Sequence, residues 1–314
     1  MTDLDGGRGV ELNAGEAPRD PEEAEAAAIP GPAEISAATT LGAVSLTVAD
    51  LGRSLAYYEQ TVGLKTLERA GQRASLGTDD RELLQLVEEP GARPAAGYTG
   101  LYHFALLVPE RADLARWLAH AARERWPIVG LSDHFVSEAI YLSDPDGHGI
   151  EIYWDRPREL WEGRVRERMT TLRLDVDDLL AELDDPAAEP FDALAIGTVM
   201  GHVHLKVAAI PDTVAFYRDL LGFGLMAQLG PQAAFLSAGG YHHHIGANTW
   251  ESGGASPSPA RTASLRHATI VLPDPPERDR LITRLEHGGR SLEESGGDSV
   301  VVDPSGNRLL ITVA

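Results

Sequence analysis

One structural pattern occurs four times along the chain, and this internal repeat restricts the possible folds more than any other feature. Each copy combines an alternating apolar strand, an amphipathic helix and further short strands. Two copies match closely: they begin at Leu41 and His202, and the helix of each carries two adjacent aromatic residues. A glycine follows each helix, at Gly63 and Gly222, in a position suited to ending it. The repeat predicts a chain built from βαβββ modules.

The other two copies share a turn before their last strand. They begin near Tyr102 and Arg266 and contain Asp-Pro-x-Gly at residues 144–147 and 303–306. Proline sets φ at the first turn position and glycine tolerates positive φ later, so this motif favours a tight turn.

The repeats predict two domains of two modules each, over residues 40–156 and 198–314. A charged connector, residues 157–197, separates them, with a helix expected over Asp175–Leu183. Residues 1–38 contain nine acidic and two basic residues with few large apolar ones. Such a segment buries too little apolar surface to offset its ordering entropy, so it predicts a disordered acidic tail.

The composition excludes several classes of chemistry. The chain has no cysteine, which excludes disulfides, thiolate nucleophiles and cysteine-ligated zinc or iron–sulfur clusters. Any metal must therefore be held by His, Asp or Glu. A net charge of −21 argues against a nucleic-acid partner. The lack of a long apolar run and of a signal peptide predicts a soluble cytoplasmic protein without a membrane partner. The sequence leaves the oligomeric state open, a homo-oligomer included.

Four βαβββ modules with these aromatic pairs and turns resemble the vicinal oxygen chelate superfamily. It includes glyoxalase I, extradiol ring-cleaving dioxygenases, fosfomycin-resistance enzymes and bleomycin-binding proteins. The resemblance covers residues 40–156 and 198–314. It implies an α+β fold in which modules pair into two cupped half-barrels of mixed and antiparallel sheet. In that family, metal ligands come from the first and fourth strands of paired modules.

The segment from Gly130 to Glu151 resembles the signature of extradiol dioxygenases more specifically. It contains His134, Tyr141 and the Asp-Pro-Asp-Gly turn, and it departs from the usual pattern at Ser132. The whole arrangement is similar to catechol-2,3-dioxygenase-like proteins of the CatE type. The resemblance implies a non-haem Fe(II)-dependent extradiol dioxygenase that cleaves an aromatic diol of the catechol type with O2. Mn(II) is the alternative cofactor.

The family alignment assigns the ligand positions of this chain. First-strand positions fall on Ala43, His103, His202 and His267, and last-strand positions fall on Glu151 and Leu310. Two histidines and one carboxylate on one face are the donor set of non-haem Fe(II) enzymes. That set is complete when module 2 pairs with module 3, as in some ring-cleaving members, which predicts His103, Glu151 and His202 as ligands of a single metal. Whether His204 or His267 replaces His202 stays open.

Three further residues are predicted to be catalytic. His134 lies at the family position that reaches toward the substrate oxygens. His243 is favoured as an acid–base group by resemblance to a His-His-Thr-Ile pattern, and a histidine suits this role because its pKa lies near neutrality. The run His242–His244 is expected on the last strand of module 3, where alternation separates His243 from its neighbours. Which of the three faces the site stays open, and a solvent-facing strand edge is the alternative.

Tyr153 is expected to hydrogen-bond a substrate oxygen, although a packed strand tyrosine is the alternative. Trp250 and Phe135 are expected to line the cup as apolar walls.

Two other functions fit the same family. A glyoxalase-like metal-dependent isomerase or transferase would usually need a fourth protein ligand, and Gln85 lies in the wrong module pair to supply it. A metal-free small-molecule binding protein would be favoured if the histidines did not converge.

Overall fold

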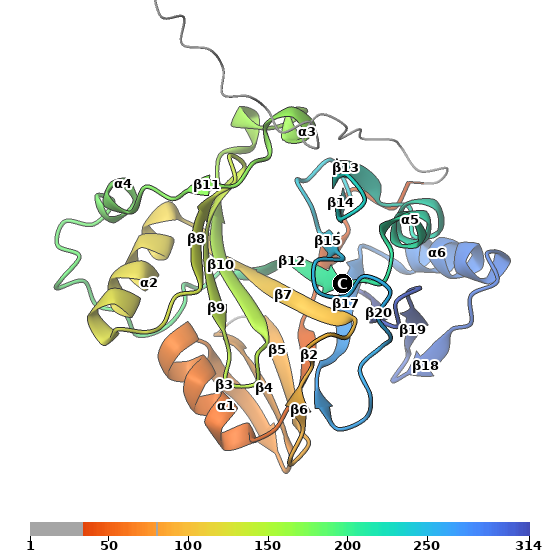
Figure 1. Cartoon of the computed structure of the whole chain (residues 1–314), viewed down its shortest axis with the longest axis horizontal. Coiled ribbons are helices and arrows are strands. Elements are labelled where there is room, and N and C mark those ends of the chain that lie inside the picture. The colour runs from red at the N-terminus through yellow and green to blue at the C-terminus, as the bar shows by residue number, and fades with distance from the viewer. Residues whose placement is uncertain (1–33, 80) are drawn as a thin grey trace, which may run out of the picture.

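The computed structural model of the protein describes residues 34–79 and 81–314 and contains the four expected modules (Figure 1). Module 1 consists of β2 (Val44–Val48), α1 (Leu51–Tyr57), η2 (Tyr58–Val62), β3 (Lys65–Ala70), β4 (Arg73–Thr78) and β5 (Arg81–Glu88). Module 2 consists of β7 (Gly100–Leu107), α2 (Arg111–Glu124), β8 (Gly130–Asp133), β9 (Ser137–Ser143) and β10 (Gly149–Asp155). Module 3 consists of β12 (Val199–Lys206), α5 (Ile210–Val214), η4 (Ala215–Leu220), β13 (Gly224–Leu229), β14 (Ala233–Ser237) and β15 (Ile245–Asn248). Module 4 consists of β17 (Leu265–Leu272), α6 (Pro275–His287), β18 (Glu293–Ser295), β19 (Asp298–Val302) and β20 (Arg308–Val313).

Shorter elements lie outside the modules. They are β1 (Thr40–Leu41), β6 (Arg93–Pro94), η3 (Arg158–Leu160), α3 (Val165–Arg168), β11 (Leu172–Arg173), α4 (Val176–Leu180) and β16 (Thr262–Ala263). No helix in the described part of the chain has the length and apolar character needed to cross a membrane.

The modules combine into two large sheets. One sheet has the order β11-β8-β9-β10-β7-β12-β15-β14-β13, and β7 of module 2 lies antiparallel to β12 of module 3 at its centre. The other has the order β18-β19-β20-β17-β2-β5-β4-β3, and β17 of module 4 lies antiparallel to β2 of module 1. We call these the 2–3 sheet and the 1–4 sheet. The predicted α+β class of paired modules is therefore confirmed, with module 2 beside module 3.

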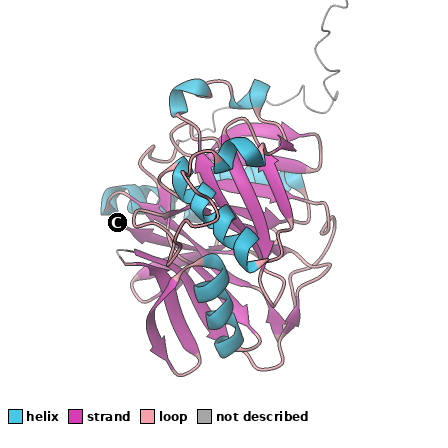
Figure 2. Ribbon diagram, turned by 90° about the vertical axis from the view of Figure 1, so that its left-hand side faces the viewer, coloured by secondary structure: helices cyan, strands magenta, loops and turns pink. Residues whose placement is uncertain are grey.

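The helices cover one face of the sheets and leave the other face open. Helix α1 contacts β5, α2 contacts β10 and α6 contacts β20. Figure 2 shows the helices lying over the strands. One continuous hydrophobic core includes buried side chains from every module, among them Leu46, Phe104, Phe216 and Leu309. The opposite, concave faces are thus free to form cavities.

The two motifs of the sequence repeat meet in space. The hydroxyl of Tyr58, in the helical part of module 1, donates to the Asp144 carboxylate in the turn of module 2 at 2.9 Å. The hydroxyl of Tyr217 donates in the same way to Asp303, between modules 3 and 4, at 3.2 Å. Each aspartate also accepts backbone N–H groups of its own turn. Modules adjacent in sequence are therefore joined through helix and turn, whereas the sheets join module 2 to 3 and module 1 to 4.

Three expectations about local structure need comment. The predicted tail, residues 1–38, lies mostly outside the described residues, but Ile35 is buried and its backbone N–H bonds to the Gly222 carbonyl at 3.0 Å. The predicted tail thus extends too far, because an apolar side chain near its end packs in the core.

The connector helix is shorter than expected: α4 begins after its N-cap, Asp175, and ends at Leu180.

The run His242–His244 does not lie on a strand, contrary to prediction. Strand β15 begins only at Ile245, and the three histidines form the loop before it. The alternation argument therefore does not apply to them, and their directions follow from side-chain hydrogen bonds instead.

Candidate metal centre

Three buried side chains from neighbouring strands converge on the concave face of the 2–3 sheet. Glu151 on β10 and His202 on β12 both pair with Ala105 of the central strand β7. The small side chain of Ala105 leaves space between them. His103 lies two residues before Ala105, so it points to the same face. Their relative exposures are 6%, 1% and 2% for His103, Glu151 and His202.

The distances within this group fit a shared metal ion. Nε2 of His103 and Nε2 of His202 each lie 3.0 Å from Oε2 of Glu151, and the two nitrogens lie 3.3 Å apart. Ligand atoms about 2.1 Å from an ion would be separated by about 3.0 Å at right angles, and by about 3.5 Å in a tetrahedron. The observed set is close to three adjacent corners of an octahedron. Such a set leaves the opposite positions open for other ligands.

The charges within the group favour cation binding. Burial opposes ionisation of Glu151, but the neighbouring His202 and His103 rings outweigh it and hold the pKa of Glu151 well below its usual range. Burial lowers the pKa of His202 despite the nearby carboxylate. A carboxylate beside neutral imidazole is the protonation state that a metal requires of its ligands.

His204 and His267, the two alternative ligands, lie outside this group. His204 is buried, and its Nε2 lies 3.0 Å from the side-chain nitrogen of Asn248. Only His103, Glu151 and His202 bring donor atoms together in the described part of the chain. His267 lies on β17 in the 1–4 sheet.

A cavity of about 680 Å³ opens beside the three donors. Tyr102, Phe235 and Trp250 form aromatic parts of its wall, and the rings of Tyr102 and Trp250 lie 5.4 Å apart. Trp250 is 48% exposed, as expected for a residue at an entrance. Met169 and Thr170 of the connector close another side. The sequence did not predict any site residue in the connector, because no periodicity or motif distinguishes these residues.

His134 lines this cavity and is linked to Glu151 through Tyr141. Nδ1 of His134 lies 2.8 Å from the Thr170 carbonyl, and Nε2 lies 2.8 Å from the Tyr141 hydroxyl. A carbonyl only accepts, so Nδ1 donates to Thr170, while Nε2 and the Tyr141 hydroxyl share the other hydrogen bond. Burial and the hydrogen-bonded Glu151 raise the pKa of Tyr141 well above its usual range. Tyr141 is a site residue that the sequence reasoning noted only as part of a motif.

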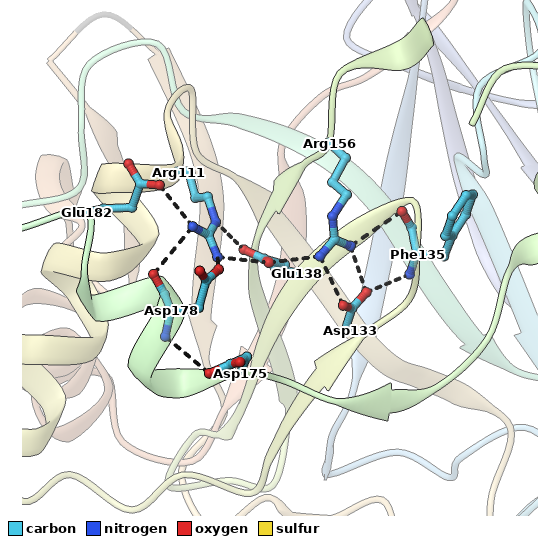
Figure 3. Close-up of polar contacts among 8 residues, drawn as sticks. All are labelled: Arg111, Asp133, Phe135, Glu138, Arg156, Asp175, Asp178 and Glu182. Carbon is cyan, nitrogen blue, oxygen red and sulfur yellow. Dashed lines mark hydrogen bonds and ion pairs between the residues drawn. The ribbon is translucent and has the colours of Figure 1, made fainter. Parts of the chain in front are cut away.

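Ion pairs hold the turn that carries His134. Figure 3 shows Arg156 between two carboxylates: it bonds Asp133 at 2.6 Å and Glu138 at 2.9 Å. Asp133 also accepts the backbone N–H of Phe135, whose φ of 66° is unusual for a residue other than glycine. Arg111 continues the network from Glu138 to the connector residues Asp178 and Glu182. The network thus fixes both the turn and the connector around the cavity.

His243 also lines the cavity, and its neighbours define its protonation. Nε2 of His242 lies 2.9 Å from the Asp155 carboxylate, so this nitrogen carries the proton. Nδ1 of His242 must then accept from Nδ1 of His243, 2.8 Å away. Nε2 of His243 is left as an acceptor, and it has no hydrogen-bond partner among the described residues. Burial lowers the pKa of His243 well below its usual range, so the ring is a neutral base.

Two expected cavity residues lie elsewhere. Tyr153 is fully buried and does not line the cavity; its hydroxyl bonds Tyr241 at 2.8 Å and sits over Gly201, where any side chain would collide with it. Tyr153 thus takes the packed arrangement that was the alternative to a contact with the substrate. Phe135 packs instead near Val136 and Trp161 in a separate cluster. Phe135 is not among the residues that line the cavity.

Comparisons with known proteins agree with this architecture. The family model described as glyoxalase/bleomycin resistance protein/dioxygenase superfamily matches residues 40–152 and 199–311. A Bacillus subtilis protein named catechol-2,3-dioxygenase is 43% identical over 273 residues, which cover 85% of this chain and 94% of that protein.

Solved structures show the same fold at low identity. A candidate dioxygenase from Bacillus subtilis is 13% identical with a TM-score of 0.61, and the match covers 90% of this chain and 86% of that one. Glyoxalase I from Zea mays is 14% identical with a TM-score of 0.52, covering 87% and 92%.

Proposed function

Because the chain belongs to the glyoxalase/bleomycin resistance protein/dioxygenase superfamily, we propose that it is an extradiol dioxygenase that cleaves a catechol-type substrate with O2. The single observation that carries the proposal is the donor group of His103, Glu151 and His202, with separations of 3.0–3.3 Å beside an aromatic-walled cavity. The relative named catechol-2,3-dioxygenase, at 43% identity, supports the same activity. The resemblance inferred from the motifs is thereby confirmed at the level of the family.

The cofactor of the proposed reaction is Fe(II), with Mn(II) as the alternative, held by His103, Glu151 and His202. When bound, it would supply adjacent coordination positions for the diol oxygens and for O2. The two-histidine, one-carboxylate set is the usual one for this chemistry in non-haem iron enzymes.

The protein would orient the aromatic ring of the substrate and accept the proton that the diol loses. Tyr102, Phe235 and Trp250 provide apolar surface for the ring, and they exclude water from one side. A catechol must lose a proton to bind as an anion, and Nε2 of His243 is an unprotonated acceptor at the cavity wall. The neutral ring can accept a hydrogen bond or the proton from the diol, although burial lowers the pKa of His243 and so disfavours the charged ring.

His134 and Tyr141 would provide a second route for protons on the opposite side of the donor group. The Tyr141 hydroxyl can donate either to Glu151 or to Nε2 of His134. His134 thus acts through Tyr141 in this arrangement, while both line the cavity.

A direct test is anaerobic reconstitution of the purified protein with Fe(II), followed by catechol and air. We expect O2 uptake together with a yellow ring-fission product, and neither signal with the Glu151→Gln variant. O2 uptake without ring fission, or metal binding without either signal, would contradict the proposed activity.

The glyoxalase-like alternative gains no support from the donor group. Gln85, the residue considered as a fourth ligand, lines the cavity of the 1–4 sheet. Glu151 lies in the other sheet, so the two residues belong to different sites. A metal-free binding protein has no need for three converging donors.

A further inference from the structure

A second cavity, of about 500 Å³, lies on the concave face of the 1–4 sheet. It is the counterpart of the metal cup in the other sheet. In the metal cup, Glu151 pairs with Ala105, which lies two residues after His103. In the 1–4 sheet, Leu310 pairs with Thr269, which lies two residues after His267. Leu310 and His267 therefore correspond to Glu151 and His103. We call this cavity the 1–4 cup.

Of the donor set of the metal cup, the 1–4 cup has a counterpart only at His267. Leu310 stands at the place of Glu151, and an aliphatic side chain cannot bind a cation. Ser45 is the partner of His267 on the neighbouring strand, and Gln85 pairs with Ser45 in turn. Uncharged polar groups thus form the floor of the cavity.

Two arginines of the 1–4 cup stand at strand positions where the metal cup has uncharged residues. Arg266 precedes His267, whereas Tyr102 precedes His103 in the other cup. Arg308 lies two residues before Leu310, at the place of Gly149. Burial lowers the pKa of His267, and the charges of Arg266 and Arg308 lower it further, which places both guanidinium groups near the ring.

The charges of the 1–4 cup are only partly compensated. Arg308 is paired with Glu293 at 2.7 Å, but Arg73 and Arg266 form no ion pair with any described residue. Glu68 and Glu82 also line the cavity. Glu82 accepts a hydrogen bond from the Gln85 amide at 2.6 Å. Arg73 and Arg266 therefore present two guanidinium groups without a carboxylate partner among the described residues, and Arg266 donates only to the Thr47 hydroxyl, at 3.4 Å. Each group can bind an anion, beside the carboxylates of Glu68 and Glu82 in the same cavity.

The positions of the two unpaired arginines define the shape of the ligand. Arg73 lies on β4 and Arg266 on β17, and β2 and β5 run between these strands. Three strand spacings of about 4.8 Å separate the two backbones by about 14 Å. Both arginines line the same cavity, so their guanidinium groups can bind two ends of one small ligand. Each guanidinium can bind a carboxylate through two parallel hydrogen bonds.

We propose that the 1–4 cup binds a small organic dicarboxylate, with one carboxylate at Arg73 and the other at Arg266. The floor residues Ser45, Ser75 and Gln85 would contact the linker between the carboxylates. This site is separate from the proposed metal centre and does not depend on the proposed ring cleavage.

Titration calorimetry of the metal-loaded protein with succinate and with phthalate, at low ionic strength, tests the proposal. We expect saturable binding of one dicarboxylate per chain that weakens as salt is added. Arg73→Ala and Arg266→Ala should each weaken it at least about tenfold, as expected for loss of a charged hydrogen-bond pair. Both side chains are exposed at the cavity, so the variants should fold.

Lys206→Ala is the matched control, because Lys206 is a cationic residue of the metal-side cavity. Dicarboxylate binding should persist in this variant. Propionate, benzoate and inorganic phosphate should bind much more weakly than the dicarboxylates. Absence of binding at millimolar concentrations, equal binding of the comparison anions, or binding lost in Lys206→Ala and kept in Arg73→Ala would each overturn the proposal.

Discussion

Nε2 of His103 and Nε2 of His202 face each other at 3.3 Å although 99 residues separate them in sequence. The antiparallel pairing of β7 with β12 creates this contact, because it joins a strand of the first half of the chain to a strand of the second. Two ring nitrogens and a carboxylate oxygen in mutual contact are favourable when a cation lies among them. The proposed activity therefore depends on the pairing of modules 2 and 3.

The first prediction concerns the metal ligands. His103→Ala, His202→Ala and Glu151→Gln should each abolish tight metal binding, because each removes or weakens one of three protein donors. The wild-type protein should retain about one Fe or Mn per chain after dialysis. Elemental analysis measures this directly.

His267→Ala is the control for that prediction. Its side chain lies in the 1–4 sheet, away from the three donors, so metal content and turnover should match the wild type. Loss of metal from His267→Ala, or two tightly bound ions per wild-type chain, would contradict the single-site assignment.

The second prediction concerns the base at the cavity wall. His243→Ala should keep the metal but lower kcat by roughly 10²–10⁴, the usual effect of removing a positioned acid–base group. Asp155→Asn should lower kcat by about 10–100-fold, because the new amide can donate to Nε2 of His242. Nδ1 of His242 would then carry the proton and donate to Nδ1 of His243, and Nε2 of His243 would no longer be an acceptor. Steady-state kinetics of the metal-loaded variants measure both effects.

Tyr241→Phe is the matched control for Asp155→Asn. It removes the hydrogen bonds of the Tyr241 hydroxyl to the same carboxylate, at 2.7 Å, and to Tyr153, at 2.8 Å, while the contact of Asp155 with His242 stays. Near-normal kcat is expected. If Tyr241→Phe were as slow as Asp155→Asn, the effect would come from packing and not from the direction of the protons.

The convergence of His103, Glu151 and His202 could be predicted because the resemblance to the vicinal oxygen chelate superfamily assigns the ligand positions and the pairing of module 2 with module 3. Each residue occupies a repeated position of its module, and the side-chain period of a strand then determines the face. The aromatic pairs that contain Tyr58 and Tyr217 and the Asp-Pro-x-Gly turns were both recognised as motifs. That the tyrosines bond the aspartates of these turns was not predicted.

Other parts of the site depend on contacts that no local pattern encodes. Met169 and Thr170 reach the cavity because distant ion pairs, such as Arg111 with Asp178, hold the connector in place. Tyr153 was misassigned because its burial depends on the space above Gly201 of the neighbouring strand. The histidine loop before β15 was misassigned as strand because apolar periodicity cannot identify three consecutive polar rings.

The third prediction concerns the turn that presents His134. His134→Ala should retain metal and lower kcat by about 10²–10⁴. Arg156→Gln should lower kcat less and reduce the free energy of unfolding by about 1–3 kcal/mol, because charged hydrogen bonds to Asp133 and Glu138 are lost. Lys65→Gln is the control: its pair with Asp79 is exposed on both sides, so both quantities should hardly change.

The fourth prediction concerns the N-terminal segment. From its composition alone, deletion of residues 1–33 should change the free energy of unfolding by less than about 1 kcal/mol. Deletion of residues 1–38 should lower the free energy of unfolding further. It removes the buried Ile35 and the hydrogen bond from the Ser36 N–H to Glu277 at 2.9 Å. Chemical denaturation of the two truncated proteins tests the difference. Equal stability would mean that these contacts contribute nothing.

The fifth prediction concerns the acid sensitivity of the metal-free protein. Burial lowers the pKa of His204 and His243 well below the usual value, and burial together with nearby charges lowers that of His244 to about 3. In the unfolded chain these rings take up protons near pH 6.5. The unfolded state therefore binds more protons than the folded state below about pH 6.5, so stability is present above that pH and is lost as the pH falls toward the folded pKa values.

Each such histidine contributes a slope of up to about 1.4 kcal/mol per pH unit. His244 suits the test because it neither lines the cavity nor belongs to the donor group. Urea denaturation of the metal-free protein between pH 7 and pH 5 should show a steep loss of stability. His244→Gln should reduce that slope by about 1 kcal/mol per pH unit, since one proton fewer is taken up on unfolding. An unchanged slope would show that His244 is protonated equally in the folded and unfolded states.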